Sequence, residues 1–241
     1  MDLLNDLLDV LDDGEVLETW IGLHWTAVVA DVNGECRCGL ASTLHGSHSG
    51  SPPVPDAGHL ETRSGTELAS LLKADGLTLR SVGMATVNAL LPRYPESWSD
   101  QNAEDVIANH GEGRRVALVG RFPFVSRLEQ RVGELFVFEK DPGEGEYSPE
   151  ECPHIISSCD VVAITGMTLI NHTLEGLLEM CAPDARVLIL GPSTPLSPVL
   201  FEYGVSMLSG AVVTDIASVL RAVGQAATFR QVHREIGRAH V

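Results

Sequence analysis

Short runs of apolar residues alternate with longer mixed segments throughout the second half of the chain. The runs are "RRVALVG", "LFVFEK", "CDVVAITG", "ARVLILGPS" and "GAVVTD". Nearly continuous apolar character is typical of parallel strands that are buried on both faces, and the intervening segments are long enough for crossover helices. The pattern therefore predicts an α/β domain with a Rossmann-like parallel sheet over residues 114–234.

The first half has a different order of elements. Leucines recur at helical spacing from Leu3 to Leu11, and Asp13-Gly14 ends this predicted helix. The strand patterns "EVLETWIG" and "WTAVVAD" follow, and "NGE" predicts a hairpin turn into "CRCGLA". Helical patterns return in "SGTELASLLKA" and "RSVGMATVNALL". We expect a smaller α+β domain over residues 1–95 and a linker with one short helix over residues 96–113.

Charge and composition narrow the class of partner. The net charge is −17, and most of it lies in residues 1–112, where 5 Lys/Arg face 18 Asp/Glu, a balance of −13. Such a surface argues against nucleic acid and anionic membranes as partners, whereas it is compatible with cations. No apolar run reaches the roughly 18 residues needed to span a bilayer. With an odd count of five cysteines and no secretory signal, we expect a cytoplasmic protein with reduced thiols.

Polar residues follow the first two predicted strands of the parallel sheet. Ligands of such sheets bind outside the carboxyl ends of the strands. The first strand is followed by Gly120 and Arg121, but "GRFPF" is not a G-x-G-x-x-G fingerprint, which argues against ordinary dinucleotide binding. Arg121 is a candidate for binding an anion. The second strand ends in Glu139, which could hold a ribose, hold a cation, or simply carry a solvated charge.

The third predicted strand ends in Thr165-Gly166, and a cluster of small polar residues follows. Gly166 would allow a tight turn or the close approach of a ligand. One residue of the cluster is expected to cap the next helix, with Thr168 and Asn171 as the candidates. A cap does not explain the whole cluster, which also contains His172 and Thr173, so we expect some of it to contact a ligand.

The fourth and fifth strands are also followed by polar residues. The loop "GPSTPLSP" carries Ser193 and Thr194, whose hydroxyl and backbone N–H groups suit an oxyanion or a carboxylate, with a helix cap as the structural alternative. Asp215 follows the last strand and is expected at the same edge of the sheet. No nucleophile elbow, C-x-x-C pair or H-E-x-x-H motif is present.

These strand-end segments resemble a known family. "VALVGRFPF", "DVVAITGMTLINHTLEGLL", "ARVLILGPSTPLSPVLFEYGV" and "LSGAVVTD" look like DUF364, a family named for heavy-metal chelation. "GLHWTAV", "CGLAST", "ELASLL" and "SVGMATVNALL" look like its usual N-terminal partner, DUF4213. The resemblance implies an enolase N-terminal-like domain followed by a Rossmann-like domain, with a ligand site in the cleft between them.

The resemblance also implies a set of site residues. Glu139 and Asp215 are the expected metal ligands. The expected ligand-binding residues, which include Gly120 and Arg121 from the strand-end argument, are Asn88, Gly120, Arg121, Thr165, Gly166, Asn171, Ser193 and Thr194. Because soft metals prefer Cys and His, which these motifs mostly lack, a metal–organic complex fits better than a bare heavy-metal ion.

Three hypotheses for function therefore remain. The first is a protein that binds a metal ion or a metal–organic complex, that is, a small-molecule or metal ligand. The second is an enzyme of unknown reaction that uses a nucleotide-like cofactor over the parallel sheet, with Glu139 on the ribose and the Ser193-Thr194 loop at an anionic intermediate. The third is a structural or regulatory partner. Whether any reaction is catalysed, and whether the chain forms a homo-oligomer, the sequence leaves open.

The last seven residues match a DNA sequence that does not come from a protein-coding gene. "EIGRAHV", residues 235–241, is the peptide that a DNA-sequencing adapter would encode when read into the open frame. We expect this tail to be foreign to the natural chain, so that His240 has no functional role.

Overall fold

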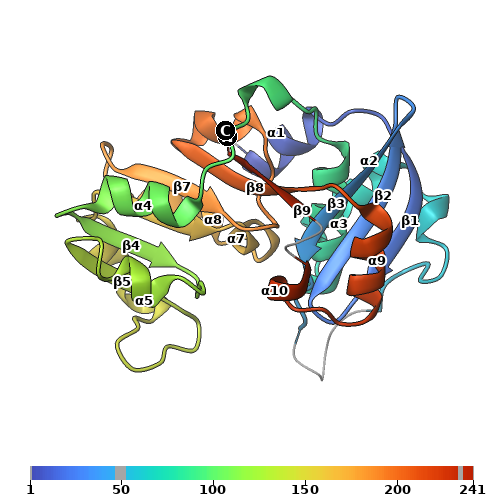
Figure 1. Cartoon of the computed structure of the whole chain (residues 1–241). Coiled ribbons are helices and arrows are strands. Elements are labelled where there is room, and N and C mark those ends of the chain that lie inside the picture. The colour runs from blue at the N-terminus through green and yellow to red at the C-terminus, as the bar shows by residue number, and fades with distance from the viewer. Residues whose placement is uncertain (1, 47–52, 233–235, 241) are drawn as a thin grey trace.

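The computed structural model describes residues 2–46, 53–232 and 236–240, which form two halves lying side by side (Figure 1). The first half contains α1 (Leu3–Asp9), β1 (Glu15–Ile21), β2 (Trp25–Val32), β3 (Glu35–Ser42), η1 (Leu60–Thr62), α2 (Gly65–Ala69), η2 (Ser70–Lys73) and α3 (Leu77–Leu90). The connector contains η3 (Pro95–Ser97) and α4 (Ala103–Gly111). This order of a helix, three strands and further helices confirms the predicted α+β character of the first half.

The three strands form an antiparallel sheet in the order β1-β2-β3. Asn33 and Gly34 both have positive φ, 56° and 84°, as a two-residue hairpin turn requires. Helix α3 packs on this sheet (Figure 1). The packing depends on Gly39, because a Cβ there would lie 2.0 Å from the carbonyl oxygen of Ala85 in α3.

The second half contains the parallel strands and their crossovers. Its elements are β4 (Arg115–Val119), α5 (Val125–Leu128), β5 (Glu134–Phe138), η4 (Pro149–Glu151), α6 (Cys152–Ile156), β6 (Val161–Thr165), α7 (Met167–Ile170), α8 (Leu174–Met180), β7 (Arg186–Leu190), η5 (Pro198–Tyr203), β8 (Met207–Val213), α9 (Ile216–Gly224), α10 (Phe229–Val232) and β9 (Ile236–His240). The sheet order is β5-β4-β6-β7-β8-β9. The first five strands are parallel, as predicted, and β9 runs antiparallel to β8.

Helices cover both faces of the parallel sheet because its strands are apolar on both sides. Along β6, Val161 and Ala163 face the cluster that includes α4 and α5, whereas Val162 and Ile164 face the cluster that includes α6, α7 and α8. The second cluster continues into the first half, where it takes in α1 and α3. The two halves therefore share one hydrophobic core.

The end of the chain returns to the first half. Strand β8 contacts β3, and α9 lies over β1 and β2 (Figure 1). A core cluster joins Val219 and Val223 of α9 to Ala27 and Val29 of β2. The predicted domain boundaries at residues 95 and 114 stay predictions, but the packing of α9 shows that the last helices complete the first half's core. The enolase N-terminal-like comparison also stays a prediction.

Strand β8 overturns one expectation. Leu190, the last residue of β7, lies beside Ser209, so β8 continues for four residues past that point, about 13 Å at the rise of a strand. Asp215 therefore lies well outside the edge where the sequence placed it. Beyond Ser209, β8 pairs with β9 of the tail and contacts β3 of the first half, where Val213 shares a core cluster with Cys38 and Leu40.

The C-terminal tail contains the last strand of the sheet. Residues 236–240 of the expected foreign tail form β9, Glu235 and Val241 lie outside the described residues, and the origin of the tail stays a prediction.

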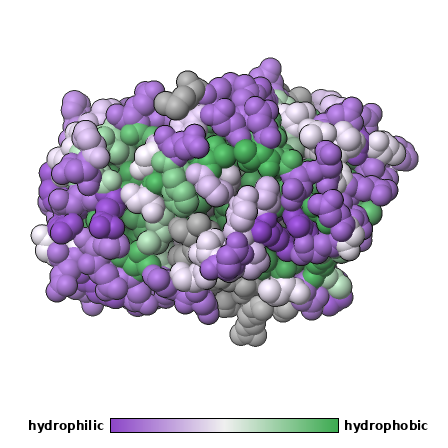
Figure 2. Space-filling model, turned by 90° about the horizontal axis from the view of Figure 1, so that it is seen from above, coloured by the Kyte–Doolittle hydropathy of each residue, from purple (hydrophilic) through white to green (hydrophobic). Residues whose placement is uncertain are grey.

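Hydrophobic residues form a broken band across the upper face, framed by hydrophilic ones (Figure 2). Because most soluble proteins expose much apolar surface, the band alone names no partner. No helix among the described residues combines the length and apolar character needed to span a bilayer.

Candidate functional site between the two halves

The carboxyl ends of four strands meet at one edge, as expected. Val119 at the end of β4 lies beside Phe138 of β5 and Ile164 of β6, and Thr165 lies beside Leu190 of β7. Across the sheet the five parallel strands lie in the order β5-β4-β6-β7-β8. The direction of winding reverses between β4 and β6, which is the usual ligand position in such sheets.

Gly120 and Thr165 are in contact at this switch point. Gly120 has a φ of 107°, which favours glycine. A Cβ there would lie 3.0 Å from Cγ2 of Thr165. The structure therefore brings these two predicted residues together, and tight packing accounts for the glycine.

The loop after β7 is buried against the first half. Ser193 and Thr194 are each 2% exposed. The backbone N–H of Ser42, at the end of β3, donates to Oγ of Ser193 at 2.9 Å, and the Ser193 hydroxyl donates to Oγ of Ser42 at 3.2 Å. We call the contact of loop 191–197 with β3 and α3 the seam. The alternative that Ser193 or Thr194 caps a helix is wrong, because the next helical segment begins after Ser197.

Gly166 also belongs to the seam. A Cβ at Gly166 would lie 2.7 Å from both the backbone nitrogen and Oγ1 of Thr194. The group that approaches Gly166 closely is therefore Thr194 of the neighbouring loop. A direct contact between Gly166 and a ligand stays a prediction.

A small cavity of about 30 Å³ opens at the seam. Asn88 of α3 and Thr194 line it together, so two predicted residues from different halves share one cavity. Asn88 is held in place because its Nδ2 donates to the carbonyl oxygen of Leu40 at 2.9 Å. The Oγ1 atom of Thr194 is buried and has no hydrogen-bond partner among the described residues. Such a group is costly unless something satisfies it.

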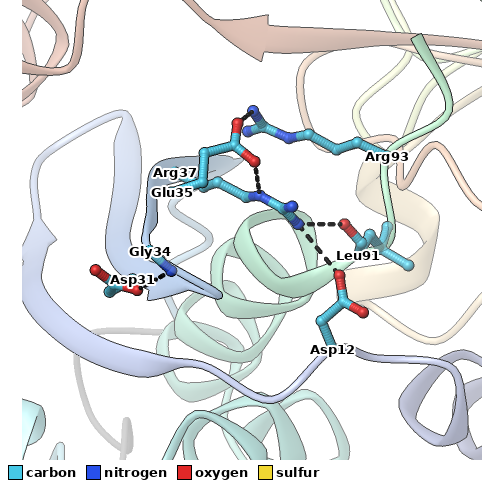
Figure 3. Close-up of polar contacts among 7 residues, drawn as sticks. All are labelled: Asp12, Asp31, Gly34, Glu35, Arg37, Leu91 and Arg93. Carbon is cyan, nitrogen blue, oxygen red and sulfur yellow. Dashed lines mark hydrogen bonds and ion pairs between the residues drawn. The ribbon is translucent and has the colours of Figure 1, made fainter. Parts of the chain in front are cut away.

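The other lining residues of this cavity were not among the predicted site residues, and they include Cys38, Arg93 and Trp98. Arg93 and Trp98 come from the connector, which has no strand-end or motif signal. Arg93 Nη1 pairs with Oε1 of Glu35 at 3.2 Å, and the same carboxylate accepts from Nε of Arg37 at 2.7 Å (Figure 3). Burial lowers the pKa of Arg93 from its ordinary value.

Burial also changes the thiol at the cavity. Cys38 is 3% exposed, and desolvation raises its pKa to about 12. A protonated thiol is a poor metal ligand and a poor nucleophile. Cys38 therefore serves as an apolar wall at neutral pH.

The outer end of the same edge differs in character. Arg121 is exposed, and its Nε and Nη2 both donate to the carboxylate of Glu146, the former at 2.9 Å. This pairing, with a further bond from the backbone N–H of Gly143, lowers the pKa of Glu146 to about 2. Glu139 is half-buried, and its Oε2 accepts from the backbone N–H of Lys140 at 3.3 Å. Arg121 thus already has an acidic partner, and its role towards a ligand stays a prediction.

Glu139 and Asp215 cannot bind the same ion. Their strands, β5 and β8, are four strand spacings apart, about 19 Å. Asp215 caps α9, where its Oδ1 accepts from the backbone N–H of Ser218 at 3.0 Å and its Oδ2 from the Ser218 hydroxyl at 2.7 Å. These bonds lower its pKa. Within the described residues, no group of three or more His, Cys, Asp or Glu is placed to hold a metal.

The polar cluster after β6 makes local contacts. The Thr168 hydroxyl donates to the carbonyl oxygen of Thr165 at 2.7 Å, and Oδ1 of Asn171 accepts from the Thr173 hydroxyl at 2.6 Å. His172 has a φ of 60°, and its Nε2 lies 2.8 Å from the carbonyl oxygen of Leu72 in the first half. The predicted cap by Thr168 or Asn171 is wrong, since Thr173 occupies the N-cap position of α8. A ligand contact of Asn171 stays a prediction.

These features define a two-part α/β protein in which the loop after β7, at the carboxyl edge of the parallel sheet, is buried against the antiparallel-sheet half. The chain belongs to the DUF364 family, described as "Putative heavy-metal chelation", which matches residues 102–241. DUF4213, with the same description, matches residues 4–91. Both families are those that the sequence motifs resemble.

Similar proteins extend over nearly the whole chain. The uncharacterized protein MJ0500 of Methanocaldococcus jannaschii is 24% identical over 90% of this chain and 86% of its own length. A crystal structure of a DUF364 protein from Desulfitobacterium hafniense matches with a TM-score of 0.85 and 24% identity, and one from Pyrococcus horikoshii with a TM-score of 0.84 and 22% identity. Each covers 99% of this chain and 97% of the other. At this identity the structures establish the fold.

Proposed function

We propose that the protein binds a metal–organic complex at the seam between its two halves. The observation that carries the proposal is the cavity lined by both Asn88 and Thr194, in which one of the lining residues has a buried hydroxyl without a partner. The family description, heavy-metal chelation, supports a metal-containing ligand.

The chemistry of the cavity favours a complex over a bare ion. Arg93 carries a positive charge at the cavity wall, and Cys38 stays protonated because burial raises its pKa to about 12. Both features disfavour direct ligation of a cation. In the proposed function, the organic part supplies the ligands of the metal, while the protein binds the organic part.

The cavity has to enlarge for this function. A volume of about 30 Å³ holds roughly one water molecule, so it accommodates one functional group of a ligand. Residues 92–98 of the connector supply one wall through Pro92, Arg93 and Trp98. We propose that this segment moves outward when the rest of the complex binds.

The test is native mass spectrometry of freshly purified protein, prepared without chelator or affinity metal, together with elemental analysis. We expect a bound mass equal to a metal plus an organic molecule, and its release by a strong chelator. A bound mass without metal, or a protein that acquires no mass when incubated with the cell extract it came from, would refute metal–organic binding.

The cofactor-dependent enzyme remains the second candidate because of one observation. Glu139 follows β5, the neighbour of β4, and an acidic residue at that place holds the ribose in dinucleotide-binding sheets. Binding of an adenine nucleotide, seen as a thermal shift that Glu139→Ala abolishes, would favour it. Unchanged melting temperatures across a panel of adenine nucleotides would count against it.

A further inference from the structure

We propose that Arg93, Asn88 and Thr194 form a subsite for a carboxylate group, so that the organic part of the ligand is a polycarboxylate chelator. The inference rests on the proposed function and deepens it by naming the chemistry of the ligand. It adds Arg93, which no sequence motif indicated, as a binding residue.

Arg93 is held at the cavity with donors to spare. Among the described contacts, only its Nη1 is used, in the 3.2 Å bond to Glu35. Glu35 is shared with Arg37, which is also paired with Asp12 at 3.2 Å (Figure 3). A guanidinium has five N–H donors in a planar fork that matches a carboxylate. The Glu35 contact thus positions Arg93 and leaves donors for a second anion.

The other two residues of the subsite can also donate. Asn88 uses one Nδ2 hydrogen on the carbonyl oxygen of Leu40, and an amide nitrogen carries a second hydrogen. Thr194 is 2% exposed, and its buried Oγ1 atom has no hydrogen-bond partner among the described residues. One guanidinium, one amide N–H and one hydroxyl can all donate to the lone pairs of a carboxylate. The positive charge of the guanidinium disfavours an ammonium group or a bare metal ion.

The rest of the wall strengthens this preference. Leu196, Ala211 and Val212 line the cavity beside Trp98. Charge-assisted hydrogen bonds are stronger where apolar walls exclude water. Although the protein is strongly acidic overall, Arg93 supplies a positive charge at this cavity.

The test is calorimetric titration of the full chain with metal-free citrate. Arg93→Met removes the guanidinium and keeps an extended side chain, and we expect citrate to bind about tenfold more weakly or worse. Thr194→Val replaces the hydroxyl by a methyl group of the same shape, and we expect a loss of about fivefold to tenfold.

Two matched controls separate the subsite from general effects. Arg63→Met removes the same charge from an arginine that is paired with Asp56. Ser197→Ala removes a buried hydroxyl that has no partner among the described residues, and Ser197 belongs to the same loop as Thr194 but does not line the cavity. Both should bind citrate within twofold of wild type. Equal affinity of Arg93→Met and wild type for citrate would overturn the subsite, as would binding of inorganic phosphate with no binding of citrate.

The outcomes also separate this inference from the proposed function. If nickel citrate binds equally to wild type and Arg93→Met, the subsite is refuted and metal–organic binding stands. If metal-free citrate binds in an Arg93-dependent way while native mass spectra refute a metal, the subsite stands and the metal-binding function is refuted.

Discussion

The polar residues at the carboxyl edge of the parallel sheet are buried at one part of the edge and exposed at another. At the seam, Ser193 and Thr194 are each 2% exposed and lie against β3 and α3 of the first half. At the open end, beyond β4 and β5, Arg121 is exposed and bonded to Glu146. Both segments follow parallel strands, so their difference comes from what covers them.

The difference indicates where a ligand would gain the most binding free energy. An exposed ion pair is screened by water and contributes little. A buried hydroxyl without a partner costs free energy, which a ligand that accepts its hydrogen bond would recover. A ligand would therefore gain more binding free energy at the seam than at the open end, although the open end carries more charge.

The largest expected effect tests the closeness of the seam. Gly166→Ala would place a Cβ 2.7 Å from the backbone nitrogen of Thr194, and overpacking of this kind should lower the free energy of unfolding by about 2–3 kcal/mol. Urea unfolding followed by circular dichroism measures it. Gly143→Ala at the open end is the control, because its nearest neighbour is the flexible Glu146 side chain at 3.4 Å. Equal stability of the two variants would show that the seam is loosely packed.

A smaller effect of opposite sign tests the unsatisfied hydroxyl. Thr194→Val should raise the free energy of unfolding by about 1 kcal/mol, because it removes a buried donor that has no partner. Chemical denaturation without ligand measures this gain. Ser197→Ala, for which the same argument holds, should give a gain of similar sign. Destabilisation by Thr194→Val would mean that its hydroxyl is already satisfied in solution.

The smallest effect concerns the open end and depends on pH. Bonds from Arg121 and Gly143 lower the pKa of Glu146 from 4.5 to about 2. A carboxyl whose pKa is lowered by folding stabilises the fold at pH values above its pKa in the unfolded chain. That stabilisation disappears as the pH falls towards its pKa in the folded protein. Glu146→Gln should therefore be slightly less stable than wild type at pH 6, and the difference should vanish between about pH 4.5 and 2.

Acid unfolding profiles of wild type and variant measure that difference. Glu144→Gln, two positions earlier in the same exposed loop, is the control and should follow wild type throughout. A Glu146→Gln difference that persists unchanged at pH 2 would contradict the ion pair as its source.

Local patterns in the sequence were enough to predict most of the elements. Five apolar runs gave the five parallel strands, and "NGE" gave the hairpin whose Asn33 and Gly34 have positive φ. The gathering of Gly120, Thr165 and Ser193 at one edge followed from the parallel topology. These features depend on short-range periodicity and turn chemistry, which one sequence carries.

The tertiary features could not be predicted in this way. The extension of β8 beyond Ser209 accompanies its contact with β3, from a distant part of the chain. Arg93 reaches the cavity because it pairs with Glu35, 58 positions earlier. The polar cluster after β6 looked like a ligand site, whereas Thr168 and Thr173 are engaged in local bonds and His172 reaches Leu72. Each depends on contacts between distant segments.

Hydrogen–deuterium exchange with and without saturating citrate tests the central claim, that the ligand site lies at the seam. We expect slower exchange in residues 88–98 and 191–197, which contain Asn88, Arg93 and Thr194, and unchanged exchange at the open end. Protection confined to residues 120–124 and 139–147, or no protection anywhere, would contradict it.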